Sequence, residues 1–244
     1  MRLFAVVSYR GTNYQGWQRQ PNVITIQEEI EKTLSQYFNR EIVISGAGRT
    51  DSGVHALGQT FHFDVDLEDI DLDRFLYSIN CMLPADIKIE DIEQVDDDFH
   101  ARFSAKEKVY SYQMVLRSKD PLFYDIMYTC PYKLDLKAME EALTYFIGEH
   151  NFKNFTSKEE DKDNFVRNVY DITFENNGDY VNIIFRGNGF MRYMIRYMVG
   201  TALEVARGRM TLEEVKALLD ENSERNIVSF KAPAEGLLLL EVRY

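Results

Sequence analysis

The sequence predicts an α+β protein whose strands pair mainly in the antiparallel direction, and three observations support this class. Segments with the period of a strand outnumber segments with the spacing of a helix. The sequence Asn176-Asn177-Gly178-Asp179 lies between two strand-like runs, which is typical of a β-hairpin turn. A similar succession of strands and helices follows in each half of the chain, so we expect two α/β halves.

The chain up to residue 116 is expected to hold five strands and two helices. Apolar residues recur at helical spacing from Ile26 to Tyr37, and Thr25 precedes Glu28 by the interval of a capping box, so a helix is predicted at 25–38. The other predicted elements are strands at 2–9, 41–45, from 59, 87–95 and 106–116, and a helix at 71–82 that ends before Pro84.

The second half repeats this plan. A helix is predicted at 135–147, where Gly148 supplies the stop signal. The further elements are strands at 166–174, 180–185 and 237–244, a long apolar helix at 190–206, and an amphipathic helix at 211–219. The polar segment 149–164 is expected to be an exposed loop. The predicted division is an N-terminal subdomain at 1–103 and a C-terminal subdomain at 104–244.

Composition places the chain among soluble globular proteins, and we expect it in the cytoplasm. It has 244 residues, of which 45% are hydrophobic and 28% charged. It has no apolar run approaching the ~18 residues that span a membrane, and its N-terminus lacks the pattern of a signal peptide. The two cysteines, Cys81 and Cys130, lie too far apart in sequence to form a metal motif or a disulfide framework.

The charge is unevenly distributed. The whole chain carries a net charge of −12, and the stretch from Asp64 to Asp98 has thirteen acidic residues against two basic ones, a local balance of −11. The stretches 99–119 and 186–209 each have five basic residues and one acidic residue, a balance of +4. Because a local basic face attracts phosphates even on an acidic protein, we expect the acidic stretch to face away from a bound nucleic acid.

A glycine-rich segment at 46–59 is the strongest local signal. It reads GAGRTDSGVHALGQ and places Asp51 and Arg49 between two strand-like runs. Such a loop allows another molecule to approach the main chain closely, and catalytic groups are often found on loops that rigid strands hold. From the residues alone, a tight turn in which Asp51 hydrogen-bonds its own backbone is an equally good interpretation.

Five segments in order along the chain resemble motifs of the TruA family of tRNA pseudouridine synthases. The segment GRTDSGVHA at 48–56 is similar to the active-site loop of that family. The others are YRGTNYQGWQRQP at 9–21, FHARFSA at 99–105 followed by Tyr110, GFM at 189–191 followed by MIR at 194–196, and APAEGL at 232–237. The resemblance therefore spans the whole chain.

The resemblance implies a fold, a reaction and partners. The implied fold is two α/β halves around a shared, mainly antiparallel sheet with a central, positively charged cleft. The implied reaction is the conversion of uridine to pseudouridine at positions 38 to 40 of the tRNA anticodon arm, without a cofactor or a metal. The implied partners are tRNA and a second copy of the chain in a homodimer, and no membrane.

The resemblance also assigns catalytic roles. Asp51 matches the catalytic aspartate of the family, and an ionised aspartate can act as a nucleophile. In a closed cleft desolvation raises the pKa of a carboxyl group, so a nearby cation is needed to keep Asp51 charged. We expect Arg196 to be that cation, because a lone arginine on an apolar helix is costly unless it is paired. Arg49 is a rival partner, and Arg196 could instead reach the helix edge.

Further residues are expected to bind the substrate. Tyr110 matches the family aromatic that stacks on the flipped base, although Tyr110 and Tyr112 could both be core residues of one strand face. Leu237 and Phe190 are expected to line the pocket, and a core role is open for each. Phosphate contacts are expected from three basic residues, for which solvated positions are the alternative: Arg102, Lys108 and Arg192, the last one turn before Arg196 on the same helix face.

Two rival functions remain open. One is an RNA-binding protein without catalysis, and the other is a metal-dependent phosphodiesterase that uses Asp51 and His55, although such a pair is weak evidence for a metal site. The sequence also departs from the family pattern at Arg10, which replaces an aspartate, and at Lys108, which replaces an arginine. These departures bear on which uridines are chosen, and the loop with Asp51 is intact.

Overall fold

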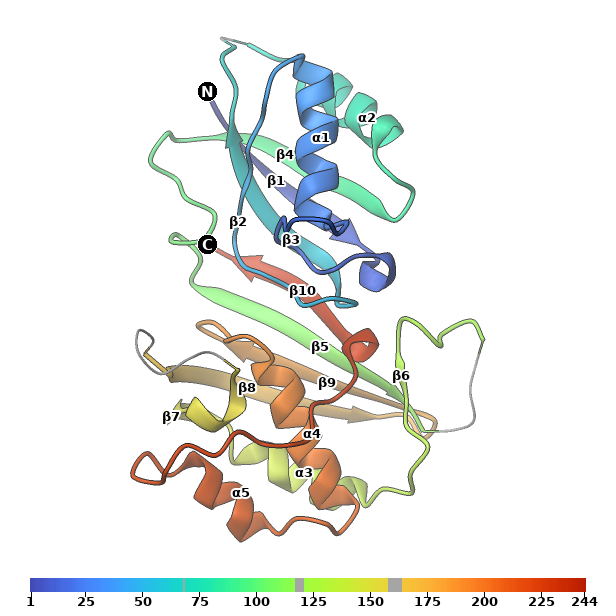
Figure 1. Cartoon of the computed structure of the whole chain (residues 1–244), viewed down its shortest axis with the longest axis vertical. Helices are drawn as coiled ribbons and strands as arrows, with labels where there is room; N and C mark the ends of the chain where they lie inside the picture. The colour runs from blue at the N-terminus through green and yellow to red at the C-terminus, as the bar shows by residue number, and fades with distance from the viewer. Residues whose placement is uncertain (68, 117–120, 158–163) are drawn as a thin grey trace. The chain divides into compact units, whose positions relative to one another are not determined.

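The computed structural model describes residues 1–67, 69–116, 121–157 and 164–244 (Figure 1). The chain divides into two compact units. Unit 1 comprises Met1–Lys106 together with Leu239–Tyr244, and unit 2 comprises Glu107–Leu238. The segment Leu239–Tyr244 thus groups with the N-terminal half, although the predicted C-terminal subdomain, 104–244, includes it.

Unit 1 is a mainly antiparallel sheet with two helices. Its elements are β1 (Arg2–Tyr9), η1 (Gly11–Asn13), α1 (Ile26–Phe38), β2 (Ser45–Gly46), β3 (His55–Asp64), α2 (Leu72–Met82), β4 (Ile87–Val95) and most of β10 (Leu237–Arg243). The strand order is β4-β1-β3-β10, with β2 paired to β3. β1 runs antiparallel to both β3 and β4, and β2 antiparallel to β3.

Local signals explain where the helices of unit 1 begin and end. The side chain of Thr25 accepts a hydrogen bond from Glu28 N, so the predicted cap at the start of α1 is confirmed. Asn39 ends α1 with a φ of 49°, a left-handed position that asparagine tolerates. Asp71 caps α2 by accepting a hydrogen bond from Arg74 N.

One face of the unit 1 sheet packs against the helices. Leu3 and Ala5 of β1 are fully buried, and they lie opposite Phe63 and Phe61 of β3. Phe38 of α1 closes this core: its ring centre lies 6.5 Å from that of Phe63. Alternate residues of β1 and β3 therefore point to the helices, as the two-residue period of a strand requires.

The other face of the sheet is covered by the chain around residues 96–104 and by Tyr244. Phe4 of β1 points to this face, and its ring centre lies 5.3 Å from those of Phe99 and Tyr244. The Tyr244 hydroxyl donates to Ala101 O at 2.9 Å and bonds with Thr60 Oγ1 at 2.5 Å. These contacts explain why the end of the chain belongs to unit 1.

His62 anchors the covering segment to the sheet. Its Nδ1 accepts a hydrogen bond from Ala101 N at 3.1 Å, and the side chain is buried. Desolvation, followed by the charges of Arg2 and His100, lowers the pKa of His62 from 6.5 to about 4, although Asp64 acts in the opposite sense. His62 is therefore neutral in the folded protein at neutral pH.

Unit 2 contains further antiparallel strands of the sheet and three helices. Its elements are β5 (Glu107–Val115), β6 (Tyr128–Thr129), α3 (Leu136–Thr144), β7 (Gly148–Asn151), η2 (Lys153–Phe155), β8 (Val166–Asn176), β9 (Tyr180–Gly187), α4 (Met194–Ala206), α5 (Leu212–Leu219) and η3 (Ala234–Gly236). The order is β5-β9-β8-β7, all antiparallel, and β6 runs parallel to β5. The predicted β8–β9 hairpin is confirmed, and Gly178 turns it with a φ of +83°.

The structure corrects several predicted elements. The predicted strand at 41–45 shrinks to Ser45–Gly46, because Ile44 N bonds to the Glu31 side chain at 3.1 Å instead of a neighbouring strand. The helix predicted at 135–147 ends at Thr144. The segment 149–164, predicted as a loop, contains part of β7 and all of η2, and its residues 158–163 lie outside the described residues.

The predicted fold class, an α+β protein with mainly antiparallel strands, is confirmed. Among the described residues, none of the helices combines the length and the apolar character needed to cross a bilayer.

We expect His62 to make the stability of unit 1 depend on pH. The folded pKa is depressed below the unfolded value, so the contribution of the neutral imidazole is fully present above pH 6.5 and is lost as the pH falls through about 4. At about 1.4 kcal/mol per pKa unit, this contribution is on the order of 3 to 3.5 kcal/mol. Urea unfolding between about pH 4 and 7 measures this slope.

His62→Gln should flatten that slope, because glutamine can accept the bond from Ala101 N and does not titrate in this range. His150→Gln, in β7 of unit 2, is the control and should keep the slope of the unchanged protein. Equal slopes in all three proteins would contradict the assignment.

Candidate active site

The loop 47–54 connects β2 to β3 and carries Asp51. A hydrogen bond from Val54 N to Asp51 O, at 3.1 Å, closes a tight turn in which Gly53 has a φ of 79°. The loop is tied to β3 by a bond from Ala47 N to Thr60 O at 2.8 Å. The half-buried side chain of Asp51 thus sits at a defined point of a short, anchored turn.

The N-terminal motif, residues 9–21, contacts this loop at Thr50, the residue before Asp51. The hydroxyl groups of Tyr9 and Thr50 lie 2.8 Å apart, and Trp17 N donates to Thr50 O at 3.1 Å. Gly16 lies against the same carbonyl with a φ of +87°, and a Cβ there would be 2.6 Å from Thr50 O. The N-terminal motif and the loop 47–54 therefore pack directly against each other, and only glycine fits at position 16.

A second contact between these segments involves His55, at the start of β3. Gly11 N donates to His55 Nδ1 at 3.0 Å, and a Cβ on Gly11 would lie 2.0 Å from Val54 O. His55 is buried, and its Nδ1 lone pair is used by the main chain. His55 therefore has a structural role at this nitrogen, and the described residues contain no group of three side chains suited to a metal ion.

The remaining site residues of unit 1 are exposed. Arg49 lies on the loop, on the other side of Thr50 from Asp51. Arg102 lies in the turn after β4, where its guanidinium is 5.6 Å from the ring centre of Phe103. Phe103 is 76% exposed. An arginine beside an exposed aromatic ring suits contact with a nucleic acid, and Phe103 was not among the predicted residues.

In unit 2, Arg196 is buried on α4. Its Nε donates to Ala232 O at 2.8 Å, and Ala232 N donates to Arg196 O at 3.0 Å. Side chain and main chain thus both hold the segment that precedes η3. The same segment approaches α4 at Gly200, where a Cβ would lie 2.2 Å from Phe230 O. The direction of the Arg196 side chain is therefore fixed by backbone contacts.

The predicted place of Arg192 is wrong. The helix predicted from 190 begins at Met194, so Arg192 is not one turn before Arg196 on a helix face. Tyr193 has a φ of 66°, a left-handed conformation that cannot be part of an α-helix, so the helix cannot begin before Met194. Arg192 is exposed in the preceding turn and donates to the Tyr193 hydroxyl at 2.8 Å.

Tyr110 and Tyr112 of β5 have different environments. Tyr112 is fully buried, its hydroxyl donates to Pro233 O at 2.9 Å, and burial raises its pKa well above the usual value. Tyr112 is thus a core residue. Tyr110 is 8% exposed, and its ring contacts the half-buried Phe190 edge to face at 5.5 Å. Leu237 follows η3 and is buried.

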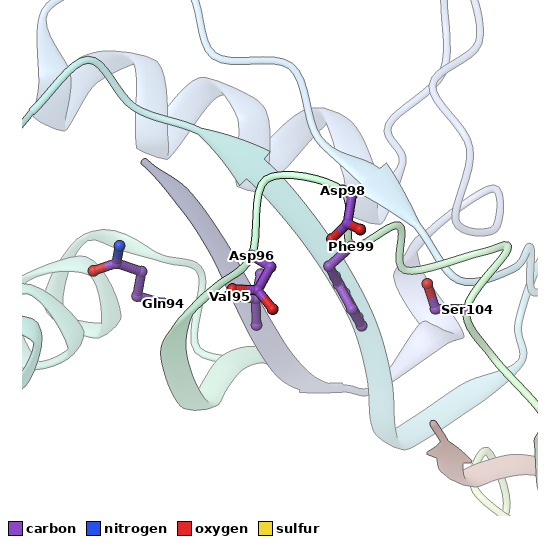
Figure 2. Close-up of a pocket in the computed structure, with 6 residues that line it drawn as sticks. All are labelled: Gln94, Val95, Asp96, Asp98, Phe99 and Ser104. Carbon is purple, nitrogen blue, oxygen red and sulfur yellow. The ribbon is translucent and has the colours of Figure 1, made fainter.

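A surface pocket of about 720 Å³ in unit 1 does not coincide with this loop. It lies at the end of β4, and Figure 2 shows its lining: Gln94, Val95, Asp96, Asp98, Phe99 and Ser104. Asp96 and Asp98 belong to the acidic stretch identified in the sequence. Because carboxylates repel phosphate, this pocket does not suit an RNA backbone.

Comparisons with known proteins agree on one family. The family model described as tRNA pseudouridine synthase matches residues 5–104 and 142–244. The chain is 40% identical over 243 residues to a protein of Exiguobacterium sp. named tRNA pseudouridine synthase A, covering 100% of this chain and 98% of that protein. A protein of the same name from Listeria monocytogenes is 40% identical over 247 residues, covering 100% of this chain and 99% of that protein.

One solved structure, titled as a crystal structure of a Cbf5-Nop10-Gar1 complex, is 16% identical to the chain. It covers 83% of this chain and 54% of the other, with a TM-score of 0.37. A likeness at this level supports no argument about the site.

We expect Gly16→Ala to destabilise the protein by about 2 to 4 kcal/mol, because it adds overpacking against Thr50 O to the cost of a positive φ. Gly178→Ala is the matched control. Its φ of +83° is nearly the same, but nothing lies within 4 Å of the added Cβ, so only about 1 kcal/mol is expected. Urea unfolding of both variants measures the difference, and equal destabilisation would show that the loop does not press on residue 16.

Proposed function

We propose the function of this chain from its family, because the chain belongs to the tRNA pseudouridine synthases, which are isomerases that act on tRNA. More specifically, it converts uridine to pseudouridine in the anticodon stem-loop, at positions 38 to 40, and acts in the cytoplasm as a homodimer. A target spread over several positions is best recognised by RNA shape and backbone. The observation that carries the proposal is that residues 9–17 hold the Asp51 loop in place through hydrogen bonds to Thr50.

The reaction explains why a held carboxylate is needed. The bond between the ribose C1′ and N1 of the base breaks, the base turns, and a bond from C1′ to C5 forms. The C5 proton leaves to solvent, and N1 takes up a proton in its place. All other atoms of the nucleotide are kept. We assign Asp51 the role of the nucleophile, since an ionised carboxylate can attack without a cofactor. A loop clamped at Thr50 would hold that carboxylate in one place during the turn of the base.

Arg196 is the proposed cation that keeps Asp51 ionised. Support comes from its burial on α4 and from the bond of its Nε to Ala232 O, which limits the directions in which the guanidinium can act. A buried arginine contributes most when it meets a carboxylate, because the desolvation cost of both charges is then offset. Arg49 stays the rival partner, since it lies on the same loop as Asp51.

Tyr110 is the proposed stacking partner of the flipped base, with Phe190 and Leu237 as apolar walls. The contrast with Tyr112 supports this role: Tyr112 is sealed in the core, whereas Tyr110 keeps some exposure and packs edge to face on Phe190. Stacking on an aromatic ring contributes about 1 to 3 kcal/mol per base. Arg102, Lys108 and Arg192 are the proposed phosphate contacts.

We expect Asp51→Asn to abolish pseudouridine formation while tRNA binding survives, because the amide keeps the size of the side chain and removes its charge. Release of tritium from tRNA labelled at uridine C5 measures turnover, and filter binding measures affinity. Asp73→Asn is the control: Asp73 is exposed on α2, within the acidic stretch, and should leave both quantities unchanged. Turnover retained in Asp51→Asn would remove the nucleophile from its proposed role.

A chelator separates this function from the phosphodiesterase alternative. We expect EDTA to leave tritium release and RNA length unchanged, because a carboxylate nucleophile requires no metal. Shortened RNA whose formation stops with the chelator would favour the phosphodiesterase. Binding of tRNA without release of tritium would favour a non-catalytic RNA-binding protein.

A further inference from the structure

The ring of Tyr193, just before α4, is surrounded by three cations. Lys231 Nζ lies 3.7 Å from the ring centre, Arg192 Cζ 4.7 Å and Arg196 Cζ 5.5 Å. The three cationic groups therefore lie close to one another, because the separation of any two cannot exceed the sum of their distances to the ring centre. All four residues belong to unit 2.

One aromatic ring does not neutralise the charges of Lys231 and Arg192. A cation over a ring is attracted only modestly, because the ring has a quadrupole and no net charge, and like charges at this range repel one another. In the described part of the chain, no carboxylate forms an ion pair with Arg192 or Lys231.

The hydrogen bond between Arg192 and Tyr193 does not use the phenolic proton of Tyr193. Arg192 Nη2 donates to the Tyr193 hydroxyl oxygen at 2.8 Å, so that oxygen acts as the acceptor. The phenolic proton of Tyr193 is then available for another acceptor. The cluster therefore offers an ammonium, a guanidinium and a hydroxyl proton at one place.

The main chain fixes this arrangement. Thr156 Oγ1 donates to Arg192 O at 3.1 Å, and Tyr197 N donates to Tyr193 O at 2.9 Å. Tyr193 is thereby held in the left-handed conformation, which is unfavourable for a residue with a side chain. Tyr193 is the N-cap residue of α4, where the positive end of the helix adds to the local potential.

We propose that Lys231, Arg192 and Tyr193 form a binding site for a phosphodiester group of the RNA backbone. The inference rests on the proposed function, because RNA is the phosphodiester that such an enzyme meets. Arg192 is exposed and Lys231 is half-buried, so a polymer can reach both. Cations and hydroxyl groups are the usual protein partners of backbone phosphates. Neither Tyr193 nor Lys231 stood out in the sequence, since each is a single residue beside a motif.

The test is the salt dependence of tRNA binding by the full chain. Removal of one phosphate-binding cation reduces the slope of log K against log salt concentration by about 0.7 to 0.9. We expect Lys231→Gln to reduce the slope by about this amount and to weaken binding about 3- to 10-fold at low salt. Lys137→Gln, which removes an exposed charge from α3 in the same unit, should keep the slope of the unchanged protein.

Two further measurements keep the outcome interpretable. Lys231→Arg retains the charge and should restore the slope. Thermal unfolding of Lys231→Gln should occur at an unchanged or higher temperature, because the repulsion between Lys231 and Arg192 is gone. An unchanged slope in Lys231→Gln, an equal reduction in Lys137→Gln, or a slope still reduced in Lys231→Arg would each overturn the phosphate site.

The same samples distinguish failure of this inference from failure of the proposed function. If the unchanged protein releases no tritium from C5-labelled tRNA, the proposed function is wrong, and the inference that rests on it is overturned as well. If it releases tritium while Lys231→Gln keeps the full slope, only the phosphate site is wrong.

Discussion

The placement of Asp51 depends on how closely two backbones approach each other at Thr50. The N-terminal segment reaches this residue from two sides, through the Tyr9 hydroxyl and through Trp17 N. Such an approach is possible only where one partner lacks a side chain, as Gly16 does at Thr50 O and Gly11 does at Val54 O of the same loop. The glycines of the N-terminal motif are therefore part of the site, although no glycine can take part in the chemistry itself.

Signals from neighbouring residues in the sequence predict some elements correctly. The start of α1 follows from the Thr25 cap, and the β8–β9 hairpin follows from its turn residues, because both depend on neighbours in sequence. The family motifs predicted which loop holds Asp51. The contact of that loop with residues 9–17 could not be predicted from periodicity, because it joins groups 33 to 44 positions apart in sequence.

Other features were missed for identifiable reasons. The apolar pattern continues through Phe190 and Met191, so periodicity extends the helix, whereas the left-handed backbone of Tyr193 delays it to Met194. The cluster around Tyr193 joins that turn to Lys231, and a single lysine carries no pattern. Net charge was equally uninformative, since the carboxylates at the end of β4 and the cations around Tyr193 lie in different units.

The position of β10 has a consequence for biosynthesis. β10 lies next to β3 in the sheet of unit 1, yet Glu107–Leu238 must leave the ribosome before Leu239–Tyr244 can emerge. During translation the nascent unit 1 therefore exposes the edge of β3 and the ring of Phe4 until Tyr244 arrives.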